Sequence, residues 1–383
     1  MNRNLRIAII GGGPGGLTLA RILACHGIRT TVFERETHPL ERPQGGTLDL
    51  HEDSGQEALR QAGLMEEFTG IARYEDQGTR LLDMAGNVLF EDAGVDGDRP
   101  EVDRTALRAM LLASLPEDCV RWGYTLRAVE TRDDGRHDLI FDQSPASEGP
   151  FDLVVGADGT WSAIRPLLSP YQPQYSGLTF LEFGIDDADH RHPAVSALVG
   201  RGKMCVEGDG KAIIALRNGN AHIRGYAIFR VPADWAAQRF DLTDPASVHA
   251  RLLREFAGYA PDIIDLFHAS NACYAIRSIY SLPPGHCWTH RRGLTLIGDS
   301  AHVMSPFGGD GVNNAMFDAA ELARHLIAAL ADGADWNAAV AGYEAAMPAR
   351  VAESAEGAAE AAATLLSHDG QALTLERYRS HAR

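Results

Sequence analysis

A glycine-rich segment directly after a short apolar run constrains the fold of this chain more than any other feature. Leu5 to Ile10 has the length and composition of a buried strand, and the spacing Gly11-x-Gly13-x-x-Gly16 follows at once. From Pro14 to His26 apolar residues recur at helical spacing, and Thr30 to Phe33 is β-branched and aromatic, which indicates a second strand. Strand, helix and strand in about thirty residues predict a βαβ unit with a parallel sheet, and hence an α/β fold.

Each glycine of this motif has its own task in binding a dinucleotide. Gly11 permits the tight turn, Gly13 lets the backbone approach a pyrophosphate, and Gly16 lets helix and strand pack closely. The helix that begins at Pro14 offers free N–H groups and the positive end of its dipole to the phosphates. Glu34 ends the second strand, where a carboxylate can accept hydrogen bonds from both ribose hydroxyls. This acid disfavours the 2′-phosphate of NADP at the site and leaves NAD or FAD.

Two further motifs lie at the ends of strand-like runs. In "VVGADGTWSAIR", Asp158 follows such a run, and Ser162 and Arg165 fall where a helix should begin, although the pattern also fits a turn with a capping serine. In "LTLIGDSAHVMSPFGGDGVNNAMFDA", a strand delivers Asp299 to its C-terminal end, where a carboxylate can accept from a ribityl hydroxyl. The turn from Pro306 to Asn313 feeds a helix whose dipole would stabilise negative charge on a flavin ring. The third motif therefore favours FAD.

Composition argues against several other functions. The formal net charge of −17 disfavours nucleic acid and anionic membrane surfaces as partners. The five cysteines are scattered, which fits reduced thiols, and no His/Cys cluster has the spacing of a metal site. The N-terminus resembles no leader, and no run approaches eighteen apolar residues. We therefore expect a cytoplasmic protein without metal, membrane or nucleic-acid partners.

In this order, the three motifs resemble those of the FAD-dependent aromatic-hydroxylase-type (group A) monooxygenases, which include para-hydroxybenzoate hydroxylase. The second motif matches the family's DGxxSxxR, and the third matches GDAAHxxxPxxGxGxN with Ser300 for one alanine and Asp310 inside the glycine turn. The stretches "GGTLDLHEDSGQEALRQAGL" and "EVDRTALRAMLLASL" are similar to those of the TetX-type tetracycline-inactivating monooxygenases. The resemblance covers nearly the whole chain.

The resemblance implies a Rossmann-like FAD-binding domain with an inserted β-rich substrate domain and a C-terminal bridging helix. We expect the FAD-binding domain to comprise residues 1–75, 100–170 and 275–330, and the substrate domain residues 76–99 and 171–274. The strand-like runs from Ser176 to Phe229 predict that the inserted sheet is antiparallel. The bridging helix would span residues 336–368 and leave a polar tail.

The same resemblance implies the cofactor site. Glu34 and Arg35 would meet the adenosine ribose, and Arg104 and Asp299 the ribityl and diphosphate region. The Gly45-Gly46-Thr47 loop, Asp49, Pro306 and Gly309 would line the isoalloxazine. The complete expected set is Gly11, Gly13, Pro14, Gly16, Glu34, Arg35, Gly46, Thr47, Asp49, Arg104, Asp158, Asp299, Pro306, Gly309, Gly311, Val312 and Asn313.

The substrate pocket is expected to depart from the TetX type. Where those enzymes use a Gln, an Arg and a His, this chain offers Glu182, Lys203 and Arg224. An acid in place of an amide loses a donor, and an arginine in place of a histidine adds a fixed fork of donors. Phe307 matches the family's aromatic residue at the junction of flavin and substrate.

The implied reaction is reduction of FAD by transiently bound NADPH or NADH, followed by transfer of one atom of O2 to an aromatic or polycyclic substrate. A tetracycline is one candidate substrate, and a phenol or another aromatic polyketide is the alternative. An FAD-dependent reductase or dehydrogenase and a non-catalytic flavin-binding protein remain open on the same fold. No catalytic side chain is expected, because the flavin carries the chemistry. We expect His302 and His51 to hold their turns, and Asp310 to oppose flavin reduction.

Overall fold

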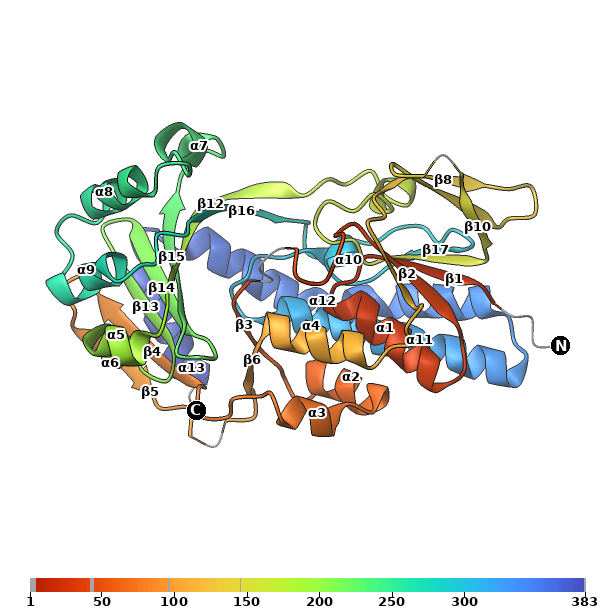
Figure 1. Ribbon diagram of the computed structural model, residues 1–383, viewed down its shortest axis with the longest axis horizontal. Helices are drawn as coiled ribbons and strands as arrows, with labels where there is room; N and C mark the ends of the chain where they lie inside the picture. Colours follow the sequence, from red (N-terminus) through yellow and green to blue (C-terminus); the bar gives the residue numbers. More distant parts are fainter. Residues whose placement is uncertain (1–4, 42–44, 96, 145, 382–383) are drawn as a thin grey trace.

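The computed structural model describes residues 5–41, 45–95, 97–144 and 146–381, which form an elongated molecule (Figure 1). A five-stranded parallel sheet and its helices occupy the end that carries the N-terminus, and a seven-stranded sheet occupies the other end. A three-stranded and a two-stranded sheet complete the strands assigned in this part of the chain. Two long helices, α11 (Asp310–Asp332) and α12 (Trp336–Thr364), run along the molecule.

The parallel sheet has the strand order β17-β11-β1-β2-β7. Its central strand β1 (Ile7–Ile10) is buried throughout and pairs in parallel with β2 (Thr30–Glu34) and β11 (Leu153–Gly156). Helix α1 (Pro14–Cys25) begins with proline at its first position and packs against α11. A strand that is apolar on both faces suits a sheet covered on both sides, so the predicted Rossmann-like core is confirmed.

The remaining elements around this sheet are short. Its outer strands are β7 (Val120–Trp122) and β17 (Leu294–Leu296). The small sheets are formed by β3 (Thr47–Asp49) with β6 (Glu101–Asp103), and by β8 (Leu126–Thr131), β9 (His137–Phe141) and β10 (Glu148–Phe151). The helices are α2 (Gly55–Ala62), α3 (Met65–Thr69), α4 (Arg104–Ala113), α10 (Asp299–His302) and the 3-10 turn η1 (Arg165–Leu167).

The seven-stranded sheet has the order β16-β12-β15-β14-β13-β4-β5. Its strands are β4 (Gly78–Asp83), β5 (Val88–Asp92), β12 (Gln174–Ile185), β13 (Gly202–Gly208), β14 (Lys211–Arg217), β15 (Ile223–Arg230) and β16 (Ala275–Ser281). The antiparallel arrangement predicted for Ser176 to Phe229 is confirmed for β12 to β15, and β4, which lies outside that range, adds to β13 in parallel. Strand β16 pairs with β12 in this sheet, although residues from 275 onward were expected in the other half.

The two faces of this sheet have different neighbours. One face packs on the helices α5 (Ala188–Arg191), α6 (Pro193–Val199), α7 (Trp235–Arg239), α8 (Pro245–Glu255) and α9 (Pro261–His268). On the other face, Leu178, Phe180 and Ile228 share an apolar cluster with Phe307, which lies just before α11, and with Ala362 of α12. This second face is therefore turned toward the third sequence motif.

Helix α12 connects the two halves, as the sequence predicts. Tyr343 of its first part is buried and donates a hydrogen bond to the Leu296 carbonyl of β17, 3.1 Å away. At its far end, Arg230 of β15 donates to the carbonyls of Ala362 and Leu365, each at 2.6 Å. The expected polar tail is itself helical: Gly370–His381 forms a further helix, α13, against the sheet. Its Tyr378 lies 5.7 Å from the Phe90 ring, between ring centres.

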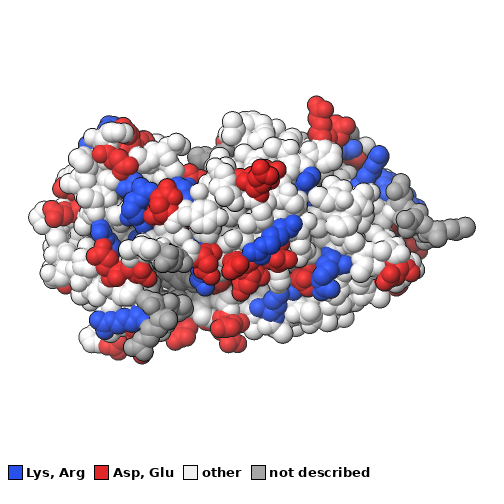
Figure 2. All heavy atoms as spheres, turned by 90° about the horizontal axis from the view of Figure 1, so that it is seen from below, with Lys and Arg blue, Asp and Glu red and all other residues white. Residues whose placement is uncertain are grey.

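Among the described residues, no helix combines the length and the apolar character that a bilayer span requires. Within the same residues, no three His, Cys, Asp or Glu side chains gather in an arrangement that could hold a metal ion. Figure 2 shows acidic and basic side chains interspersed on one face of the molecule, without a large patch of either sign.

Candidate cofactor and substrate site

The first glycine turn is built from contacts that exclude side chains. Gly11 has φ +112°, and a Cβ there would overlap the carbonyl of Ala157, which directly follows the neighbouring strand β11. A Cβ on Gly16 would overlap the Gly11 carbonyl. At Gly13, the N-cap of α1, a Cβ would meet nothing within 4 Å. The turn therefore presents an open approach to the N-terminus of α1 and its free N–H groups.

Glu34 lies beneath this turn. Its Oε2 accepts from the Gly12 backbone N–H at 2.6 Å, and its Oε1 accepts from the Glu36 N–H at 3.0 Å. The carboxylate is buried at the end of β2, where the sequence predicts it, whereas the neighbouring Arg35 is exposed.

A buried arginine that the sequence did not predict lies at this end of the site. Arg108 of α4 donates to the Gly12 carbonyl at 3.1 Å and to Glu36 Oε2 at 2.7 Å. Its guanidinium also lies 5.4 Å from the centre of the Trp122 ring. Arg108 follows Arg104 by one helical turn, so the i, i+4 spacing of two arginines was the available signal.

The second motif joins two other loops. Asp158 accepts from the Ala163 N–H at 2.7 Å and from Ser300 Oγ at 3.1 Å, and burial raises the pKa of its carboxyl. Arg165 is almost fully buried and donates to the Ser300 carbonyl at 3.0 Å. The helix expected at this point is only the 3-10 turn η1, and the Arg165 side chain reaches across to the third motif rather than into solvent.

Asp299 begins α10 at the carboxyl end of β17, as expected. Burial raises the pKa of its carboxyl, and the nearby charge of Arg104 lowers it part of the way. His302, one turn later, is hydrogen-bonded through Nε2 to Asp318 Oδ2 at 2.7 Å, and Arg350 of α12 pairs with the same carboxylate. These contacts support the expectation that His302 holds the turn.

The N-terminus of α11 lies beside strand β3. Gly309 is its N-cap with φ +80°, and a Cβ on Gly311 would meet nothing within 4 Å. Asn313 is buried, accepts from the His51 N–H at 2.9 Å and donates to the Asp49 carbonyl at 2.9 Å. The Asn313 amide therefore joins α11 to β3 and to the residues after it through hydrogen bonds. Of the other expected residues, Pro306 is exposed and Val312 is half-buried.

Asp49 and Asp310 both lie close to His51. His51 Nε2 lies 3.2 Å from Asp49 Oδ2, and His51 Nδ1 lies 3.7 Å from Asp310 Oδ1. Burial raises the pKa of Asp49, but the hydrogen bond and charge of His51 and the charge of Lys203 outweigh it, so this pKa lies below its usual value. Burial raises the pKa of the Asp310 carboxyl, while the charge of His51 lowers it part of the way.

The expected substrate residues lie on the face of the seven-stranded sheet that carries Phe180 and contacts Phe307, which we call the inner face. Glu182 pairs with Arg224 through one oxygen and with Arg277 through the other, at 2.9 Å. Lys203 lies further along, with Nζ 5.4 Å from the centre of the Tyr378 ring. Phe307 lies 5.9 Å from Phe180, between ring centres. The sequence did not predict Arg277, because strand β16 was not assigned to this sheet.

Tyr226 lies beside Phe180 and Phe307, and we call these three rings the aromatic wall. Its ring centre lies 5.8 Å from that of Phe180, and a Cβ on Gly46 would lie 3.3 Å from its hydroxyl oxygen. Burial and then the charge of Glu182 raise the pKa of Tyr226 to about 12, so its phenol is neutral at ordinary pH.

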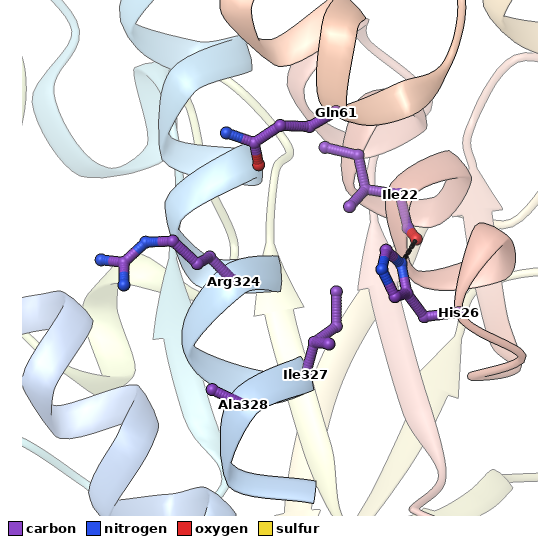
Figure 3. Close-up of a pocket in the computed structure, with 6 residues that line it drawn as sticks. All are labelled: Ile22, His26, Gln61, Arg324, Ile327 and Ala328. Carbon is purple, nitrogen blue, oxygen red and sulfur yellow. Dashed lines mark hydrogen bonds between the residues drawn. The ribbon is translucent and has the colours of Figure 1, made fainter. Parts of the chain in front are cut away.

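These residues fit FAD. Helices α1 and α11 pack together, and each has a glycine at its N-terminus, Gly13 and Gly311, where a Cβ would meet nothing within 4 Å. Both N-termini can therefore be approached by a ligand. Asp299 and Arg104 supply a carboxylate and a cation at the edge of the parallel sheet, where ligands bind in this fold class. A separate hollow of about 450 Å³, between α1, α2 and α11, contains Ile22, Gln61 and Arg324 (Figure 3) and none of the residues expected to touch FAD.

Comparison with known proteins identifies the family. The profile of the FAD binding domain matches residues 4–356. The chain is 32% identical to the monooxygenase asqM of Emericella nidulans, over 84% of each protein. The chain belongs to this family of FAD-dependent monooxygenases, so the predicted family membership is confirmed.

Solved structures agree in fold. The monooxygenase superimposes on Klebsiella pneumoniae HpxO, solved with FAD and uric acid, with a TM-score of 0.80, 23% identity and coverage of 99% and 93% of the two chains. It superimposes on the tetracycline destructase Tet(51) with a TM-score of 0.73, 21% identity and coverage of 98% and 95%. At 23% and 21% identity both matches concern the fold alone.

Proposed function

We propose that this FAD-dependent monooxygenase uses NADPH or NADH and O2 to hydroxylate an aromatic or polycyclic substrate on the inner face of the seven-stranded sheet. The observation that carries the proposal is the aromatic wall of Phe180, Tyr226 and Phe307. Phe307 directly precedes α11, so the wall lies next to the N-terminus of that helix. Flat rings pack well on such a wall. HpxO, which was solved with uric acid, supports a planar substrate.

The residues of the chain have distinct tasks in this proposal. FAD, when bound, accepts electrons from the reduced nicotinamide and activates O2. The N-termini of α1 and α11 would hold its phosphates and ring, Glu34 its ribose, and Asp299 with Arg104 the segment between them. The rings of Phe180, Tyr226 and Phe307 orient the substrate and exclude water from it.

A tetracycline is the specific substrate to test first. The fold match to Tet(51) supports it, whereas a drug amide would have to share the Glu182 carboxylate with the two arginines that already pair with it. A phenol or another aromatic polyketide fits the same wall. We also propose the domain division given by the sequence, with β16 moved to the substrate half, and a cytoplasmic enzyme, which its five free cysteines support.

The test measures NADPH, NADH and O2 consumption by FAD-loaded protein with and without a tetracycline, followed by mass analysis of the drug. Stimulated consumption and a gain of one oxygen atom would establish this substrate. Turnover with an electron acceptor under anaerobic conditions, without oxygen incorporation, would instead favour a reductase. Asp299→Ala should lose FAD and all turnover, while Asp332→Ala, at the exposed C-terminal end of α11, should behave as wild type.

A further inference from the structure

Arg277 of β16 lies at the edge of the aromatic wall. In the pairing of β12 with β16 it stands directly opposite Phe180, so the two side chains share the inner face of the sheet. Ile279, two residues further along β16, belongs to the apolar cluster on the same face, and residues two apart in a strand point to the same side. A ring packed on the wall would therefore have Arg277 beside it.

The Arg277 guanidinium is accessible to a ligand. Strand β16 is the outermost strand at its end of the seven-stranded sheet, and the Arg277 side chain is 48% exposed. Arg224, the other cation that pairs with Glu182, is only 16% exposed. Of the two arginines, Arg277 is thus the one that can meet an incoming substrate.

Glu182 occupies only one nitrogen of the Arg277 guanidinium. Arg277 Nε donates to Glu182 Oε2 at 2.9 Å, and no acceptor of the described residues lies within hydrogen-bonding distance of either Nη. A guanidinium has five N–H donors and is not deprotonated in proteins, so its charge does not depend on pH. The donors on Nη1 and Nη2 therefore remain for a ligand.

The charges around this position do not cancel. Four charged groups act on the phenol of the neighbouring Tyr226, and they are the anion Glu182 and the cations Arg224, Arg277 and Arg104. Arg104 is expected at FAD, so Arg224 and Arg277 share a single carboxylate and one positive charge remains. Because partly buried charges are screened less than charges in bulk water, an anionic group on the wall would be attracted to this position.

We propose that the substrate is an aromatic acid whose carboxylate is bound by the Nη groups of Arg277 while its ring packs on Tyr226 and Phe307. A carboxylate matches the fork of a guanidinium with two parallel hydrogen bonds, which a neutral amide with one acceptor oxygen cannot reproduce. The inference rests on the proposed function, because it names the polar group of the aromatic substrate. It assigns Arg277 as a specificity-determining residue.

The test compares 2-naphthoate with 2-naphthamide, which share one ring system and differ in charge. Their affinities for FAD-loaded protein are measured by isothermal titration calorimetry at neutral pH, with flavin absorbance as the check on FAD content. We expect naphthoate to bind about tenfold more tightly than naphthamide. Arg277→Gln should remove this preference and leave the affinity for naphthamide unchanged.

Glu182→Gln should act in the opposite direction. It removes the carboxylate that Arg224 and Arg277 share, so naphthoate should bind about threefold more tightly than it does to the wild type, whereas naphthamide should not. A variant that only disrupts the pocket would weaken the binding of both probes. Weaker naphthoate binding in Glu182→Gln would therefore count against the inference.

Arg132→Gln is the matched control. Arg132 also donates from Nε to a carboxylate, that of Asp138, and its side chain is 44% exposed, but it directly follows β8 of the three-stranded sheet. Its replacement should leave the preference for naphthoate unchanged.

Equal affinities for the two probes, a preference that survives in Arg277→Gln, or no binding of either probe would overturn the inference. NADPH-driven O2 uptake and product mass are followed separately. Selective naphthoate binding by a protein that oxygenates no aromatic compound would contradict the proposed function alone, whereas oxygenation of neutral aromatic compounds without this preference would contradict the inference alone.

Discussion

Asp49 and Glu101 lie directly opposite each other in the antiparallel pair of β3 and β6, so their carboxyl groups share one face. Glu101 Oε2 is 2.5 Å from Thr47 Oγ1, which donates to it. Burial and then the charge of Asp49 raise the pKa of Glu101 to about 7, while the pKa of Asp49 is lowered. Two half-buried acids so close cannot both ionise freely, and Glu101 holds the proton up to neutral pH.

This arrangement predicts a pH-dependent stability. The folded-state pKa of Glu101 lies above its unfolded value of 4.5, so the folded protein holds more protons between pH 4.5 and 7. The free energy of unfolding therefore falls as pH rises through this window, by an amount on the order of 2 to 3 kcal/mol from this group. Urea unfolding of FAD-loaded protein at pH 5, 6, 7 and 8 measures the slope.

Glu101→Gln replaces the acid with a neutral group of the same shape and should flatten that slope. Glu117→Gln, at an exposed position before β7, is the control and should keep it. If Glu101→Gln and wild type show the same dependence on pH, Glu101 does not carry the proton.

Gly13 and Gly11 should respond differently to alanine. A Cβ at Gly13 meets nothing within 4 Å but occupies the approach to the α1 N-terminus, so Gly13→Ala should fold normally and bind FAD at least about tenfold more weakly. At Gly11 the positive φ and the Ala157 carbonyl both exclude a side chain, so Gly11→Ala should lose folded stability itself. FAD titration and thermal unfolding, measured side by side, separate the two effects. Normal FAD affinity in Gly13→Ala would remove this turn from the cofactor site.

Asp318 should be a structural requirement of the third motif. Its buried carboxylate pairs with His302 and Arg350 and accepts from the Gly298 N–H at 2.8 Å. Asp318→Asn leaves both cations without their anion, which costs about 3 kcal/mol or more. The denaturant concentration at the midpoint of unfolding should therefore be clearly lower for the variant than for the wild type. A loss below about 1 kcal/mol would mean that the pairs contribute little.

The motif-bearing half of the fold could be predicted because its signals are local. The burial of β1 follows from its own unbroken apolar run, and the spacing of Gly11, Gly13 and Gly16 predicts the turn that follows it. The positions of the Glu34 and Asp299 carboxylates could also be predicted, because each follows from the end of a strand-like run in the sequence.

The parts that the sequence did not predict depend on contacts between distant segments. Arg277 reaches Glu182 only because β16 adds to the edge of β12, and nothing in the sequence around residue 275 indicates which sheet accepts it. Arg108 looks like an ordinary exposed helical arginine until Glu36 and Gly12 are placed beside it. Pairing β4 with β13 similarly joins residues more than a hundred positions apart.

Helix α13 shows the same limit and gives a direct experiment. Its sequence is largely polar, and its anchoring contacts are single residues: Tyr378 Oη lies 3.1 Å from Cys205 Sγ, and Gln371 donates to the Glu207 carbonyl at 2.8 Å. Cys205 is buried under this helix, and burial raises the pKa of its thiol. Of the five free cysteines, Cys119 and Cys205 are buried and the other three are exposed. Native protein should therefore titrate three thiols rapidly with a disulfide reagent such as DTNB.

Truncation after Leu366 should add a fourth rapidly reacting thiol, because it removes the helix that shields Cys205 and lowers the desolvation that suppresses its thiolate. Tyr378→Ala should produce a smaller increase in the same rate, since it opens the contact while keeping the helix. The Cys205→Ser version of the truncated chain is the control and should return the count to three. If the truncated chain still shows three fast thiols, then α13 is not what protects Cys205, and the cover must come from the sheet and from α12.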